Sequence, residues 1–254
     1  MKLSNTFSLP KANLSIVIRS CVFFLGQLLT TFTIAPLILL SSRCPFERRY
    51  ALACLWVRIN TWTLKHICGL SYAVQGLENL PQGNGIILSK HQSTWETLVF
   101  LHFLPPVVFL LKQELLNIPI WGWALRLLEP IGIDRGAKTA ALKRVLRDGE
   151  ERLKAGRWVV IFPEGTRILP GEKGRYNASG AMLAHRTGYP VVPLALNSGE
   201  FWPRKAFLKY PGVIQVRIGP PIDSTQMTAS ELNQRAEEWI ETQMTEIFGK
   251  GRAG

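Results

Sequence analysis

The 254 residues suffice for one substantial hydrophobic core, and the composition gives no sign of a long disordered segment or a second large domain. The chain has 30 Lys and Arg but only 18 Asp and Glu. The formal charge of +12 indicates an anionic partner: nucleic acid, an acidic membrane surface or a phosphorylated substrate. Nucleic acid is not expected, because the basic residues are spread along the chain without a helix-turn-helix, zinc-finger or aromatic RNA-binding motif.

An apolar N-terminal segment predicts a membrane anchor. The stretch 20–42 carries no charge, and at about 1.5 Å per residue a helix of this length can cross the hydrocarbon of a bilayer. Its apolar run is longer than the roughly 7–15 residues of a signal peptide. The next stretch, 50–70, is interrupted by Arg58 and Lys65 and predicts a helix in the membrane interface or the returning arm of a re-entrant pair. We therefore expect membrane-anchoring helices over residues 1–70.

The four cysteines all fall within this N-terminal part: Cys21, Cys44, Cys54 and Cys68. Their spacing contains no CxxC pair, which argues against a zinc site, and a chain of this length does not need a disulfide framework. We interpret them as apolar or lipid-facing thiols in a reducing compartment.

From residue 71 to residue 254, β-rich runs alternate with helical patterns. Strands are predicted at 85–90, 107–111, 131–133, 158–162, 191–197 and 213–218, and several are nearly all apolar, as in a sheet covered on both faces. Helices are predicted at 94–103, 119–129, 138–155 and 179–187, and a capping box at Thr228-x-x-Glu231 starts a C-terminal helix. This alternation predicts one α/β domain with a largely parallel central sheet flanked by helices.

A histidine and a carboxylate follow the first of these strands. His91 comes directly after 85–90, and Glu96 falls in the first turn of the next helix. Imidazole is suited to removing a hydroxyl proton at neutral pH, and a carboxylate beside it would stabilise the imidazolium. Five residues of continuous helix would separate the two side chains by about 140°, so they meet only if His91 precedes the helix. Alternatively, Ser93-x-x-Glu96 is a capping box and Glu96 serves only the helix N-terminus.

A second polar cluster follows another predicted strand. The run 158–162 leads into Pro163-Glu-Gly-Thr-Arg167, a sharp turn with a carboxylate, a hydroxyl and a guanidinium. Gly165 would allow close approach of another backbone or a ligand, and the fork of Arg167 matches a phosphate. The alternative is an ordinary turn with a solvated arginine. Because sites in α/β sheets lie at strand ends, both clusters are expected to converge on one pocket.

Four segments resemble the sequence blocks of the glycerolipid acyltransferase family, in the family's order and spacing. They are His91-x4-Glu96, Gly132-Ile-Asp-Arg135, Phe162-Pro-Glu-Gly-Thr-Arg167 and Val191-Val-Pro-Leu194. The resemblance covers roughly residues 70–220. In detail the chain is most similar to bacterial 1-acylglycerol-3-phosphate acyltransferases, which also carry an N-terminal membrane-binding segment.

The resemblance implies roles for the matching residues. His91 would be the general base and Glu96 its partner, although the family usually has Asp at that position; Glu keeps the charge and adds a methylene. The remaining residues would bind substrate: Lys112, Arg135, Glu164, Gly165, Thr166 and Arg167. Arg167 would contact the acceptor phosphate. Lys112 would face it too, or would simply snorkel beside the apolar run 107–111.

The implied reaction is direct acyl transfer from acyl-CoA or acyl-carrier protein to lysophosphatidic acid, giving phosphatidic acid for phospholipid biosynthesis. No acyl-enzyme is expected, because the chain has no GxSxG elbow. Neither a cofactor nor a metal is expected, because no ligand cluster has metal spacing. Membrane lipids are expected partners. We place the active site on the cytoplasmic side of the bacterial inner membrane, where thioester donors reside.

Two alternatives remain from the sequence. One is an acyltransferase of the same fold that uses another lysolipid acceptor. The other is a non-catalytic, basic membrane-binding protein, against which the His91–Glu96 pair and the turn at 164–167 argue.

Overall fold

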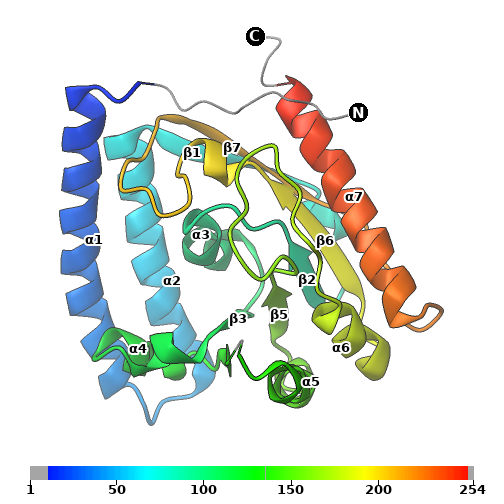
Figure 1. Cartoon of the computed structure of the whole chain (residues 1–254). Helices are drawn as coiled ribbons and strands as arrows, with labels where there is room; N and C mark the ends of the chain where they lie inside the picture. Colours follow the sequence, from blue (N-terminus) through cyan, green and yellow to red (C-terminus); the bar gives the residue numbers. More distant parts are fainter. Residues whose placement is uncertain (1–10, 135, 251–254) are drawn as a thin grey trace.

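A seven-stranded sheet lies at the centre of the structure, with helices on both faces (Figure 1). The computed structural model describes residues 11–134 and 136–250. The strands are β1 (Leu70–Gln75), β2 (Ile86–Ser89), β3 (Val107–Lys112), β4 (Ile131–Ile133), β5 (Trp158–Ile161), β6 (Val191–Leu196) and β7 (Gly212–Ile218). The α-helices are α1 (Leu14–Leu40), α2 (Phe46–Thr63), α3 (Trp95–Phe103), α4 (Trp121–Arg126), α5 (Lys138–Lys154), α6 (Ser179–Thr187) and α7 (Ala229–Lys250).

The sheet is mostly parallel, as the sequence predicts. Its strand order is β1-β7-β6-β2-β5-β3-β4. Neighbouring strands are parallel from β6 to β4, whereas β7 is antiparallel to β6 and pairs in parallel with β1. All six predicted strands form within one residue of the expected bounds. The sequence does not predict β1, because its side chains are mixed in polarity and mostly only half-buried at the edge of the sheet.

The central strand β2 is buried on both faces because alternate side chains enter different cores. Ile87 joins the cluster that includes residues of α2 and α3, and Ile86 and Leu88 join the cluster that includes residues of α5, α6 and α7. This two-sided burial explains the continuous apolar run in the sequence. The apolar run ends at Ser89 and Lys90, which are polar but still buried.

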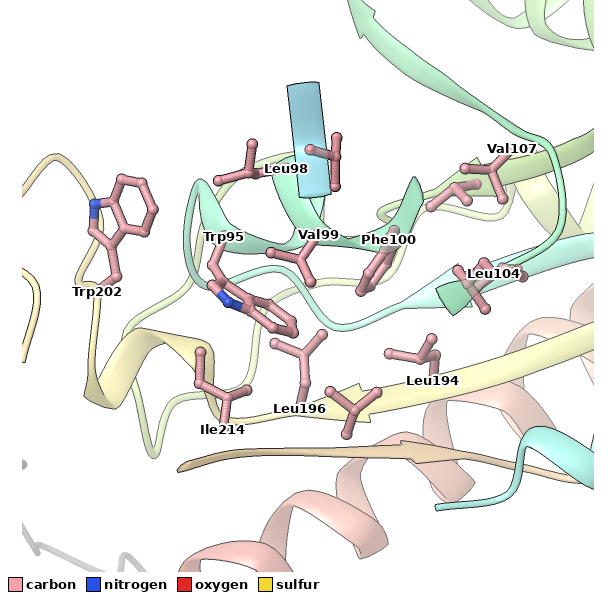
Figure 2. Close-up of a cluster of buried hydrophobic side chains, with 14 of the residues drawn as sticks. Trp95, Leu98, Val99, Phe100, Leu104, Val107, Leu194, Leu196, Trp202 and Ile214 are labelled. Atoms are coloured by element: carbon pink, nitrogen blue, oxygen red, sulfur yellow. The ribbon is translucent and has the colours of Figure 1, made fainter. Parts of the chain in front are cut away.

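Large apolar side chains pack α3 onto the sheet (Figure 2). Trp95 and Phe100 of α3 point toward Leu194 and Leu196 of β6. Trp95 is only 1% exposed and is the first residue of α3. Its burial therefore fixes the start of the helix, and it places Glu96 close to the end of β2.

The two N-terminal helices pack against each other and against the sheet domain. The helix α2 runs back along α1, since Asn60 Nδ2 donates to Thr30 Oγ1 (3.2 Å) and the Cys68 thiol donates to the Arg19 carbonyl (3.6 Å). The ring of Phe23 lies edge-on to Trp202, with centroids 5.8 Å apart. The chain therefore returns along α1. That the pair is re-entrant in a membrane, or that α2 lies in the interface, stays a prediction.

The outer face of α1 remains apolar and exposed, with Leu25, Leu29 and Phe32 each more than half exposed. The helix begins at Leu14, before the predicted start at residue 20, because Asn13 caps it by accepting a hydrogen bond from the Ile16 N–H (2.9 Å). With 27 residues, α1 is long and apolar enough to cross a membrane.

Three of the predicted helices, 94–103, 138–155 and 179–187, correspond to α3, α5 and α6. The predicted capping box starts α7, with the Thr228 N–H donating to Glu231 Oε2 (2.8 Å). The helix predicted at 119–129 is shorter at both ends. Ile120 has a positive backbone φ of 64°, which an α-helix does not accommodate, so α4 begins at Trp121; it ends at Arg126, before Glu129 with its φ of 57°.

Candidate active site

The ends of β2 and β5 bring the two polar clusters together. These strands are parallel neighbours, with Leu88 opposite Ile161, so the residues that follow each strand emerge side by side. The Ile168 N–H donates to the His91 carbonyl (2.8 Å), and the His91 ring stacks on Phe162 with centroids 4.0 Å apart. His91 therefore lies directly beside the turn that contains Arg167, as expected for two strand ends.

Glu96 both contacts the histidine and holds the loop before α3. Its Oε1 lies 3.3 Å from His91 Nδ1 and accepts hydrogen bonds from the Gln92 N–H (2.6 Å) and the Ser93 N–H (2.8 Å). The two interpretations of Glu96 are therefore compatible. An ionised carboxylate only accepts hydrogen bonds, so this contact favours the tautomer of neutral His91 that has its proton on Nδ1 and its lone pair on Nε2. The His91 side chain is 12% exposed, whereas that of Glu96 is fully buried.

Arg167 lies half-buried next to this pair. Burial lowers the pKa of its guanidinium, the Glu96 carboxylate opposes that shift, and the charge of Arg204 adds to it. Arg204 Nη1 donates to the Arg167 carbonyl (2.9 Å), so two guanidinium groups belong to the same corner of the site. Arg167 Nε is buried and lacks a hydrogen-bond partner in the described residues. A partly desolvated guanidinium with an unused donor is well placed to bind an anion.

The other residues of this turn point in different directions. Glu164 is buried, and its Oε2 accepts a hydrogen bond from the His91 N–H (3.1 Å). Gly165 and Thr166 are exposed. Gly165 has a φ of +65° and no atom near the place of a Cβ, so its backbone conformation, and not a shortage of space, favours glycine. The Glu164 carboxylate therefore points into the protein and supports the His91 backbone, whereas Gly165 and Thr166 face solvent.

Of the remaining two predicted residues, Lys112 and Arg135, the structure describes only Lys112. Lys112 ends β3, which pairs with β5. Its side chain is about half exposed, and its ammonium pairs with Glu114 (3.4 Å). Among the described residues no hydrogen bond or ion pair joins Lys112 to His91 or Arg167. Arg135 lies outside the described residues.

Lys90, which no sequence motif singles out, is a buried lysine next to the site. Lys90 Nζ donates to Glu164 Oε1 (2.8 Å) and to Glu241 Oε1 of α7 (2.8 Å). Its position between an apolar strand and His91 was the available signal, because a lysine that enters a core requires counter-charges. Its partners are 74 and 151 residues away along the chain, which no local pattern reveals.

Comparison with known proteins identifies the family. Residues 71–197 match the protein-family model described as Acyltransferase. The chain is 44% identical over 236 residues to the 1-acyl-sn-glycerol-3-phosphate acyltransferase of Pseudomonas aeruginosa, covering 91% of this chain and 89% of that protein. The chain belongs to the acyltransferase family. The family resemblance predicted from the four sequence blocks is confirmed.

More distant relatives agree with this assignment. The acyltransferase is 28% identical over 194 residues to the 1-acyl-sn-glycerol-3-phosphate acyltransferase of Saccharomyces cerevisiae, which covers 73% of this chain and 62% of that protein. Its fold matches the crystal structure of the 1-acyl-sn-glycerophosphate acyltransferase PlsC from Thermotoga maritima, with a TM-score of 0.77 and 25% identity. That match covers 94% of this chain and 97% of the other, so the acyltransferase shares both the sheet and the N-terminal helices with it.

Proposed function

We propose that the acyltransferase uses His91 as the base that activates the acceptor hydroxyl. The chain is a 1-acylglycerol-3-phosphate O-acyltransferase, and its product, phosphatidic acid, serves phospholipid biosynthesis. One observation supports this use of the site most directly: an imidazole paired with a carboxylate lies beside a half-buried guanidinium on neighbouring strand ends. The imidazole suits the hydroxyl of lysophosphatidic acid, and the guanidinium suits its phosphate.

The chemical step is a direct transfer. Glu96 holds the proton on His91 Nδ1, so the lone pair of Nε2 accepts the proton of the acceptor hydroxyl. The oxygen attacks the thioester carbonyl carbon, and the C–S bond breaks as the ester forms. The thiolate leaves and takes up the proton from the His91 imidazolium. Glu96 stabilises that imidazolium, because the carboxylate is buried in contact with the ring.

Arg167 is proposed to bind the acceptor phosphate, with Glu164, Gly165 and Thr166 shaping its turn. Lys112 and Arg135 are proposed to add positive charge to the same substrate-binding region. Lys112 is suited to this role because it ends a strand at the edge of the sheet that carries His91. Arg204 provides a second guanidinium beside Arg167.

We propose residues 1–70 as the membrane-anchoring part and 71–254 as the catalytic domain. The exposed apolar face of α1 supports this division. The donor is proposed to be acyl-CoA or acyl-carrier protein, and nucleic acid is not proposed as a partner. Because such thioesters are cytosolic, the proposed location is the bacterial inner membrane with the active site on the cytoplasmic side.

Substitution of His91 by Ala tests the proposed base. Positioned general bases contribute about 10²–10⁴-fold, so His91→Ala should lower kcat by about that factor. Glu96→Gln keeps an acceptor for the two loop N–H groups but removes the charge that stabilises the imidazolium, and should lower kcat by about tenfold or more. Thiol release from acyl-CoA with lysophosphatidic acid as acceptor measures both effects.

His185→Ala is the matched control, since His185 is an exposed histidine on α6 and its kcat should stay within about twofold of the wild type. If pure, folded His91→Ala protein turned over as fast as this control, His91 would not be the base.

Substitution of Arg167 by Ala tests the proposed phosphate contact. Loss of a charge-assisted hydrogen bond costs about 1.5–3 kcal/mol, so the KM for lysophosphatidic acid should rise about 10- to 100-fold while the KM for acyl-CoA stays constant. Steady-state kinetics with each substrate varied measures this split. Arg175→Ala, which removes an exposed arginine from the following segment, should change neither KM. Equal effects of Arg167→Ala on both substrates would contradict the assignment.

Acidic residues on the outer face of α1 test the proposed membrane anchor. Leu25 and Leu29 are 64% and 71% exposed, so Leu25→Glu with Leu29→Glu should leave the fold intact. Withdrawing each leucine from lipid costs about 1.5–3 kcal/mol, and flotation with anionic phospholipid vesicles should fall by about tenfold or more. Ser230→Glu with Gln234→Glu, at the same spacing on α7, is the control. Unchanged flotation of the α1 variant would place the lipid-binding surface elsewhere.

A further inference from the structure

Lys90 is a lysine in the interior of the protein, with its side chain 1% exposed. Burial of an ammonium group is unfavourable unless its charge and its three donors are satisfied. Here Nζ donates to Glu164 Oε1 (2.8 Å), to Glu241 Oε1 (2.8 Å) and to the Glu172 carbonyl (3.1 Å). All three donors are therefore used, and two carboxylates face one ammonium.

The surroundings of the two carboxylates make this network continuous. Tyr176 donates its phenol O–H to the same Glu241 oxygen (2.8 Å), and burial raises the pKa of that phenol, which keeps it a donor. Burial also raises the pKa of Glu164, and the charge of Lys90 acts in the opposite direction. The ammonium of Lys90 thus favours the ionised form of the Glu164 carboxylate, which can then accept hydrogen bonds with both oxygens.

Those two oxygens connect Lys90 to the catalytic base and to the loop after the turn. Glu164 Oε1 accepts from the Gly174 N–H (3.3 Å) in addition to Lys90, and Oε2 accepts from the His91 N–H (3.1 Å). The network therefore fixes the backbone that carries His91 and the turn that carries Arg167. Its far end is Glu241 on α7, which lies on the opposite side of the sheet from α1 and α2 (Figure 1).

We propose that Lys90 is a positioning residue for acyl transfer: through Glu164 it holds His91 and the Arg167 turn in register, and Glu241 of the C-terminal helix completes its coordination. Lys90 itself does not touch the substrate. This inference rests on the proposed roles of His91 and Arg167, and it adds that the active-site geometry requires a side chain from α7.

A surface ion pair provides a matched comparison. Lys173 Nζ pairs with Glu237 Oε1 of α7 (2.7 Å), so this pair also links the loop that follows the Arg167 turn to α7. The Lys173 side chain is 57% exposed and the pair does not include Glu164. If the link between loop and helix were all that mattered, breaking either pair would have similar consequences. If the buried lysine positions the site, only Lys90 affects catalysis.

The experiment compares Lys90→Met with Lys173→Met in the full chain, in detergent, with acyl-CoA and lysophosphatidic acid as substrates. Lys90→Met should lower kcat about 10- to 100-fold, since small misplacement of a catalytic group costs up to about that much. It should also raise the KM for lysophosphatidic acid, because the Arg167 turn shifts, and leave the KM for acyl-CoA unchanged. Lys173→Met should keep all three within about twofold of wild type.

A second variant, Glu241→Gln, tests the same proposal if Lys90→Met does not fold. The Glu241 side chain is 21% exposed, and Lys90 keeps its ion pair with Glu164 when Glu241 loses its charge. This variant should therefore show the same lower kcat and higher acceptor KM, but with smaller changes. A fraction of unfolded protein lowers apparent kcat without changing either KM, so the selective rise in acceptor KM reports positioning.

The proposal is overturned if folded Lys90→Met matches Lys173→Met, if its kcat falls without a change in acceptor KM, or if both KM values rise together. These outcomes are distinct from failure of the proposed function, which would appear as normal kinetics of His91→Ala and Arg167→Ala in the wild-type background.

Discussion

The parallel pairing of β2 with β5 is the constraint on which the site depends. Leu88 lies opposite Ile161, so the chain leaves the sheet at two adjacent points. Two hydrogen bonds then lock the emerging segments together, one from the Ile168 N–H to the His91 carbonyl and one from the His91 N–H to Glu164. A histidine and an arginine turn that are distant in sequence thereby lie side by side.

This arrangement buries several charged side chains, which is unfavourable. Each of these side chains makes more than one stabilising contact. Glu96 orients the His91 ring and also accepts two backbone N–H groups that precede α3. Glu164 supports the His91 backbone and also pairs with Lys90. Removing one partner of a buried pair leaves the other uncompensated. The same buried side chains thus hold both the fold and the proposed site, whereas the exposed Lys173–Glu237 pair contacts neither His91 nor Glu164.

Local signals explain what the sequence could predict. The strands β2 and β5 are fully buried, are apolar except for Ser89, and lead directly into polar motifs, so the positions of His91 and of the turn follow from the pattern alone. The inward orientation of Glu164 does not, because a carboxylate in a turn is usually solvated and its partner Lys90 is 74 residues away. The edge strand β1 was not predicted for a related reason. It pairs with β7, which is distant in sequence, and its half-buried side chains give only a weak hydrophobic pattern.

The most direct measurement is a crystal structure of the chain with lysophosphatidic acid bound in the absence of an acyl donor. In that complex the phosphate oxygens should accept hydrogen bonds from the Arg167 guanidinium, and the free hydroxyl should lie within hydrogen-bond distance of His91 Nε2. A headgroup bound away from the turn at 163–167, or a hydroxyl on the far side of the sheet from His91, would contradict it.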